Sequence, residues 1–93
     1  MSLRLAGITF DRHHYDPRGD VLYLNVARYD RAPAHTYATP EGHCVEYDEA
    51  WRVVAMILVN VRWLLDRDGE LKITWPAAHV RRDELAETLR AEA

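Results

Sequence analysis

Hydrophobic and polar residues alternate on both sides of two short corners in the chain, Asp16-Pro17-Arg18-Gly19 and Thr39-Pro40-Glu41-Gly42. Such alternation is typical of β-strands with one buried face. In each corner proline presets φ at the first turn position, and glycine can adopt the left-handed conformation that closes a type I turn. Both corners therefore predict β-hairpins with three-residue loops.

Loop length decides which residues of the first hairpin lie opposite each other. A loop of Pro17–Gly19 places Tyr15 opposite Val21 and His13 opposite Tyr23. The other parity gathers apolar side chains on one face, which we expect to be the core face: Ile8, Phe10, Leu22, Leu24 and Val26.

The second corner predicts its own pairing. A loop of Pro40–Gly42 places Tyr37 opposite Val45 and His35 opposite Tyr47. The side chains of Tyr37, Val45 and Tyr47 then share one face, as expected of a half-buried hairpin.

The segment from Arg52 to Asn60 is apolar on both parities and rich in β-branched residues. A helix is the alternative interpretation of such a run. The β-branched content and the possible pairing of Tyr47 with Val53 favour a central strand covered on both faces.

The remaining segments predict two helices and one more strand. Asn60 can cap a short helix near 61–66, and the helix should end at the cluster before Gly69. Leu71, Ile73 and Trp75 alternate with polar residues and predict a last strand, which Pro76 stops. A second helix is expected near 82–91, where the apolar stripe of Leu85 and Leu89 repeats at helical spacing.

Together these elements predict an α+β fold in one domain, residues 1–93. We expect a single antiparallel sheet of about five to six strands, built as a meander of hairpins, together with one short helix and a C-terminal helix that packs on this sheet or on a neighbouring chain.

Composition narrows the classes of function. The net charge of −3 gives no electrostatic reason for a nucleic acid or an anionic membrane as partner. Cys44 is the only cysteine, which excludes an internal disulfide and points to a reducing cytoplasm. The longest apolar run, 53–59, is too short to span a bilayer, and the N-terminus has no signal-peptide pattern.

The stretches YDPRGDVLYLNV, ATPEGHCVEYDEAWRVV and ILVNVRWLL resemble a large bacterial family of small proteins catalogued as a domain of unknown function. Its pattern opens on Tyr-Asp-x-x-x-Asp-x-Leu-Tyr, and the resemblance covers roughly Ile8 to Leu65. Trp51 stands where the family commonly has a turn glycine, which implies a rebuilt or strained turn, and Asn60-Val61-Arg62 replaces Asp-Ala-Ser. Some relatives are similar to one half of toxin–antitoxin gene pairs, which implies protein binding.

Titratable residues gather in the segment from Asp11 to Asp16. Adjacent strand residues point to opposite faces, so His13 can share a face with Asp11 but not with His14. One alternative is therefore a small metal- or ligand-dependent enzyme that uses His13, Asp11 and Tyr15. As metal ligands the sequence offers only weak candidates: His13, Asp11, His35 and His43. No catalytic motif or cofactor fingerprint is present, and Ser2 is the only serine.

Aromatic residues exceed what a small core needs, and their types are those of protein contact surfaces. Trp51, at a turn, is the best candidate for an exposed anchor, and Tyr37 is the second candidate interaction residue. The leading hypothesis is a non-enzymatic protein-interaction module that binds itself or a small partner protein, with an antitoxin-like role as what the resemblance implies. A weak nucleic-acid binder is a further alternative, which would require a patch drawn from Arg28, Arg31, Arg62, Arg67 or the pair Arg81 and Arg82.

Overall fold

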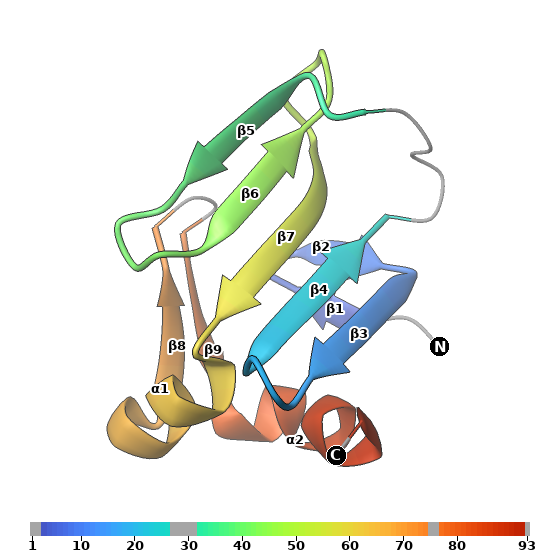
Figure 1. The fold of residues 1–93 in the computed structure, drawn as a ribbon. Coiled ribbons are helices and arrows are strands. Elements are labelled where there is room, and N and C mark those ends of the chain that lie inside the picture. The colour runs from blue at the N-terminus through green and yellow to red at the C-terminus, as the bar shows by residue number, and fades with distance from the viewer. Residues whose placement is uncertain (1–2, 27–31, 75–76, 93) are drawn as a thin grey trace.

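The computed structural model describes residues 3–26, 32–74 and 77–92. Its main element is a five-stranded antiparallel sheet in the order β3-β4-β7-β6-β5 (Figure 1). The strands in this order are Arg12–Asp16, Val21–Asn25, Val53–Val59, Cys44–Tyr47 and His35–Ala38. The apolar run after Trp51 is thus the central strand, β7, as predicted.

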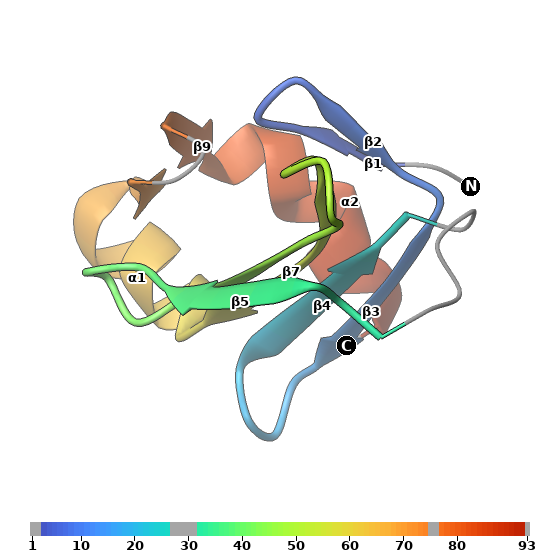
Figure 2. The same ribbon diagram turned by 90° about the horizontal axis from the view of Figure 1, so that it is seen from above.

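Two small sheets and two helices complete the fold. The strands β1 (Leu3–Leu5) and β2 (Ile8–Phe10) form one hairpin, and β8 (Glu70–Ile73) and β9 (Ala78–Arg81) form another. The helices are α1 (Val61–Asp68) and α2 (Arg82–Glu92). Figures 1 and 2 show all of these on the same side of the five-stranded sheet, so this sheet has one covered face and one open face.

The core fills the space between the covered face and these elements. The inward side chains of the sheet meet apolar residues of both helices and both hairpins, and the largest fully buried ones are Tyr15, Phe10, Leu22, Leu24, Met56, Leu58, Leu65, Leu71, Ile73 and Leu85. Packing of this kind supplies most of the stability of a small domain. The predicted core face of the first hairpin is confirmed for Phe10, Leu22 and Leu24. On the open face of β7, by contrast, Ile57 and Val59 are only half-buried, so the expectation that this strand is covered on both faces is wrong.

The α+β class, the antiparallel sheet and its hairpins are confirmed, but the expectation of one continuous sheet is only partly right. Ala6 and Gly7 both adopt positive φ, 56° and 75°, and this tight corner folds the first residues into a hairpin of their own. The strand before Pro76 is not the last one, because β9 pairs back on β8 with Val80 opposite Leu71. The predicted strand positions Trp75 and Pro76 lie outside the described residues.

The second hairpin has the predicted pairing. Tyr37 lies opposite Val45, and His35 lies opposite Tyr47. Gly42 has a φ of 96°, and the Thr39 amide donates to the His43 carbonyl at 2.7 Å, as a three-residue loop with a left-handed glycine requires.

The predicted pairing of the first hairpin is wrong by one residue. Tyr15 lies opposite Leu22 rather than Val21, and His13 lies opposite Leu24 rather than Tyr23. The loop has one residue more than expected, and Asp20, with a φ of 57°, takes the left-handed position that was assigned to Gly19. This shift turns the Tyr15 side chain onto the core face, because each step along a strand reverses the side.

Both helices lie where they were predicted, but the start of α1 is built differently. Asn60 occupies the capping position with a φ of 53°, and its side chain makes no capping hydrogen bond. Gly69 ends the helix as expected, with its amide donating to the Leu65 carbonyl at 2.9 Å. In α2, Leu85 and Leu89 are buried, and the helix packs against β3 and β9 of its own chain. No helix in the described part of the chain is long and apolar enough to cross a membrane.

Candidate functional site

Four aromatic side chains meet at the end of the sheet formed by β5, β6 and the turn between β6 and β7. The rings of His35 and Trp51 are stacked, with centroids 3.7 Å apart and planes inclined by only 6°. The ring centroids of Tyr37 and Tyr47 lie 5.8 Å and 5.6 Å from that of Trp51, and 6.3 Å from each other. We call these four residues the aromatic cluster.

Asp48 builds the turn that carries Trp51. One carboxylate oxygen accepts hydrogen bonds from the amides of Ala50 and Arg52, each at 2.9 Å, and the other accepts from Arg52 Nε at 2.9 Å. The Trp51 amide donates to the Asp48 carbonyl at 3.0 Å. The backbone hydrogen bond from Arg52 is the main reason why the pKa of Asp48 is lowered.

Trp51 is held in a conformation that its side chain disfavours. Its φ is 62°, in the left-handed region where a residue other than glycine is strained by about 1 kcal/mol. Of the two expectations for this turn, a rebuilt turn or a strained one, the structure has the strained one. Despite that strain, Trp51 remains 53% exposed and Tyr37 47% exposed. An exposed aromatic residue with a strained backbone conformation is typical of a binding surface rather than of a core.

The two predicted interaction residues, Trp51 and Tyr37, are thus brought together, and the structure adds His35 and Tyr47 to them. The register could have indicated Tyr47, because it lies opposite His35 and close to Tyr37 on the same face. His35 was missed as part of this surface because it was considered only as a metal ligand. The stacking on Trp51 depends on the geometry of the turn, which no sequence pattern near the turn predicts.

The predicted enzyme residues do not form one site. Asp11 and His13 line a cavity of about 520 Å³ together with Arg12, His14 and Asn25, but Tyr15 is not part of its wall. The Tyr15 ring is buried, and its hydroxyl donates to Asp20 Oδ1 at 2.7 Å. Burial, the hydrogen bond to Asp20 and the charge of that carboxylate raise the pKa of Tyr15 to about 12. This hydroxyl is bonded within the fold and does not line the cavity.

The two remaining metal candidates serve separate parts of the fold. His35 belongs to the aromatic cluster, whereas His43 is fully buried and its Nδ1 accepts a hydrogen bond from the Val59 amide at 3.1 Å. Burial lowers the pKa of His43 and outweighs the opposing effect of Glu41. Among residues 3–26, 32–74 and 77–92, no group of three or more His, Cys, Asp or Glu side chains is placed to hold a metal ion.

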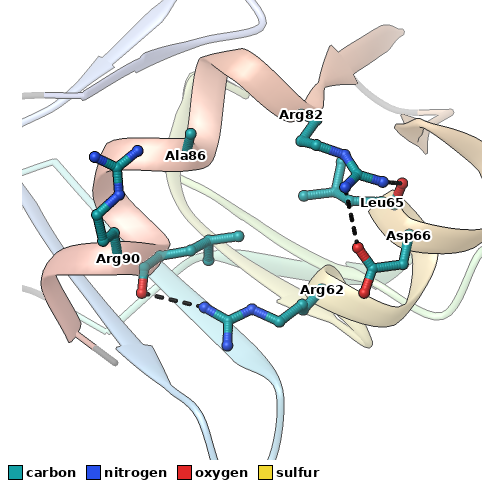
Figure 3. A pocket seen from close by; sticks show the side chains of 7 residues that line it. Arg62, Leu65, Asp66, Arg82, Ala86 and Arg90 are labelled. Atoms are coloured by element: carbon teal, nitrogen blue, oxygen red, sulfur yellow. Dashed lines mark hydrogen bonds and ion pairs between the residues drawn. The ribbon is translucent and has the colours of Figure 1, made fainter.

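A groove of about 340 Å³ between α1 and α2 carries three arginines (Figure 3). Arg82 donates to the Leu65 carbonyl at 2.7 Å and lies 3.3 Å from Asp66, and Arg62 donates to the Leu89 carbonyl at 3.4 Å. Arg82 of α2 thus bonds a backbone carbonyl of α1, and Arg62 of α1 bonds a backbone carbonyl of α2. Arginines used in this way tie the helices together.

Of the other arginines predicted for nucleic-acid binding, Arg67 and Arg81 are among the described residues. Arg67 forms an ion pair with Asp68 at 2.8 Å and lies over the Trp63 ring at 4.5 Å. Arg28 and Arg31 lie outside the described residues.

The chain was compared with protein-family models, with curated proteins and with solved structures, and none of them matches it.

Proposed function

We propose that this protein is a non-enzymatic module that binds another protein chain, its own or a partner's, through the aromatic cluster of His35, Tyr37, Tyr47 and Trp51. The observation that carries the proposal is Trp51, which is half exposed although its backbone lies at a φ of 62°. Glycine at this turn would remove the strain, and an indole that is kept there while half exposed supports a role in binding.

The chemistry of the cluster supports protein as the ligand. Tryptophan and tyrosine dominate the energetics of protein interfaces because they bury large areas with few rotatable bonds. Here the stacking of His35 on Trp51 and the contacts with both tyrosines fix the rings before any partner arrives. A preorganised surface loses little conformational entropy on binding.

The resemblance to relatives in toxin–antitoxin gene pairs would fit this function, and an antitoxin-like role is the finer form of the proposal. In that case the partner would be a small protein, and this chain would cover part of its surface.

The proposal is tested by affinity capture from cells that express the protein, comparing W51G with W63A. Trp63 is a matched control because it is 55% exposed on α1, outside the aromatic cluster. We expect a protein, an untagged copy of the chain included, to be enriched by the wild type and by W63A and to be lost with W51G. Equal capture by both variants would contradict the proposal.

A further inference from the structure

The strand β5 is an edge of the five-stranded sheet, and among the described residues no strand pairs with its outer side. In the strand order β3-β4-β7-β6-β5, the two edges are β3 and β5. The sequence of β5 is His-Thr-Tyr-Ala, without a formal charge, proline or glycine, whereas β3 carries Arg12 and Asp16 at its ends and packs on α2. Natural edge strands are usually blunted by charges, proline or bulges, because an open edge attracts another strand.

The geometry of the second hairpin identifies the backbone groups that this edge offers. The Thr39 amide donates to the His43 carbonyl at 2.7 Å, so Thr39 faces β6. The direction of the backbone N–H and C=O groups alternates from residue to residue along a strand. Two residues before Thr39, the backbone groups of Tyr37 therefore also face β6. The N–H and C=O groups of Thr36 and Ala38 then point away from β6, where the described part of the chain places no further strand.

We propose that a second copy of this chain adds its own β5 to this edge, antiparallel, with a two-fold axis at Tyr37. This inference rests on the proposed protein-binding function and names its partner. Thr36 of one copy lies opposite Ala38 of the other, and the backbone N–H and C=O groups of both residues point outward. An antiparallel pair of this kind makes about two backbone hydrogen bonds, so the two pairs make about four. Tyr37 lies opposite Tyr37 of the other copy, in a position where no backbone bond is made and side chains approach closely.

The aromatic cluster explains why the occupant is a second copy. Tyr37 contacts Trp51, so pairing at Tyr37 joins the aromatic clusters of the two copies into one surface across the axis. Neither Tyr37 nor its neighbours Thr36 and Ala38 carries a charge that would repel its equivalent. A two-fold contact of this kind is self-complementary and closes after two chains, since only the charged β3 edges remain outside.

The test places like charges across the axis without altering the aromatic cluster. In T36K/A38K each lysine faces a lysine of the other copy, and in T36E/A38E each glutamate faces a glutamate; both positions are exposed on β5. The matched control T9K/A77K makes the same substitutions at exposed positions outside β5. We expect the wild type and the control to sediment as dimers. Both β5 variants should remain folded, and the dissociation constant of their dimers should rise about tenfold or more, so that they sediment as monomers at the same concentration.

Mixing the two β5 variants is the decisive step. Opposite charges then face each other, and native mass spectrometry should find a dimer that contains one copy of each variant. A wild type that stays monomeric up to about 1 mM would overturn the inference and leave the edge for a different protein. Dimers that persist in both β5 variants would also overturn it, because the contact would then lie elsewhere.

A second measurement needs no substitution. Hydrogen exchange at the amides of Thr36 and Ala38 should slow as the wild-type concentration rises, because pairing protects these two groups. Exchange that is fast and independent of concentration would contradict the pairing. If these tests fail but W51G still abolishes capture of another protein, the proposed function stands and only the β5 dimer is wrong. If W51G also leaves capture unchanged, both proposals are wrong.

Discussion

The Oδ1 atom of Asp20 lies 2.8 Å from the backbone nitrogen of Arg62, 42 residues further along the chain, and accepts its hydrogen bond. The other carboxylate oxygen accepts from the Trp63 amide at 3.1 Å, and the Asp20 carbonyl accepts from the Val61 amide at 3.2 Å. Asp20 therefore satisfies three amides of the first turn of α1, which the Asn60 side chain leaves without a cap.

Removing this carboxylate should destabilise the domain. D20A leaves two amides of α1 and the Tyr15 hydroxyl without their acceptor, and we expect a loss of about 2–3 kcal/mol in the free energy of unfolding. D20N should lose less, because asparagine tolerates positive φ and keeps one accepting oxygen. Urea unfolding measures both, and D68A, which removes an exposed carboxylate at the other end of α1, serves as the control.

Tyr15 should make the stability of the protein fall at high pH. The pKa of its hydroxyl is raised to about 12 in the folded state, above the value near 10 in the unfolded chain. The unfolded chain therefore loses this proton first, and stability is lost as the pH rises from 10 to 12, by about 2 kcal/mol for this group.

The variant Y15F isolates that effect. At pH 8 it should be less stable than the wild type by about 1 kcal/mol, because the hydrogen bond to Asp20 is gone. Near pH 11 the order should reverse, since phenylalanine has no proton to lose. Thermal unfolding over this range measures the difference, and a constant gap between the two proteins would refute the role of the hydroxyl.

His43 should make stability fall at acidic pH. Burial lowers the pKa of His43 in the folded state, whereas the unfolded side chain titrates near 6.5. The unfolded chain thus binds the proton first, so the contribution of His43 is complete above about pH 6.5 and is lost as the pH falls below it, with a slope of at most about 1.4 kcal/mol per pH unit.

The comparison with H43Q tests this. Glutamine can still accept from the Val59 amide but does not titrate, so the advantage of the wild type should shrink between pH 7 and pH 5. The remaining histidines are the same in both proteins, and their contributions cancel. A difference in the free energy of unfolding between the wild type and H43Q that stays constant from pH 7 to pH 5 would contradict the prediction.

The strain at Trp51 predicts an order of stability between two truncations. W51A and W51G both lose the contacts with His35 and the two tyrosines, but only glycine relieves the positive φ. We expect W51G to be more stable than W51A by about 1 kcal/mol in urea unfolding. Equal stability would contradict strain at this position.

The sequence predicted the second hairpin correctly and the first one incorrectly, and the difference has a physical cause. In the corner at Pro40, spacing and residue types suit one loop, and the pairing of Tyr37 with Val45 follows. In the corner at Pro17, Gly19 fits the same loop, but Asp20 is drawn into the left-handed position, where its carboxylate reaches Arg62 and Tyr15. A demand made by a helix so far along the chain leaves no signal near the turn.

The candidate site was predictable in composition but not in arrangement. Trp51 and Tyr37 could be chosen because exposed aromatics at turns and hairpins are unusual. Their contact, and the stacking of His35, depend on the hydrogen bonds that Asp48 makes across its turn. Likewise, the missed strands β1 and β9 are short and depend on long-range burial rather than on alternation within themselves.

Because its first turn is capped by Asp20, α1 cannot be an autonomous helix. Its starting amides find their acceptor only when β3 and β4 are already joined, so the hairpin and the helix form and open as one cooperative unit. The loop of residues 17–20 lies on the surface, where insertions are ordinarily tolerated. In this protein one inserted residue would move the carboxylate away from α1, and the loop is consequently as intolerant of added length as a buried segment.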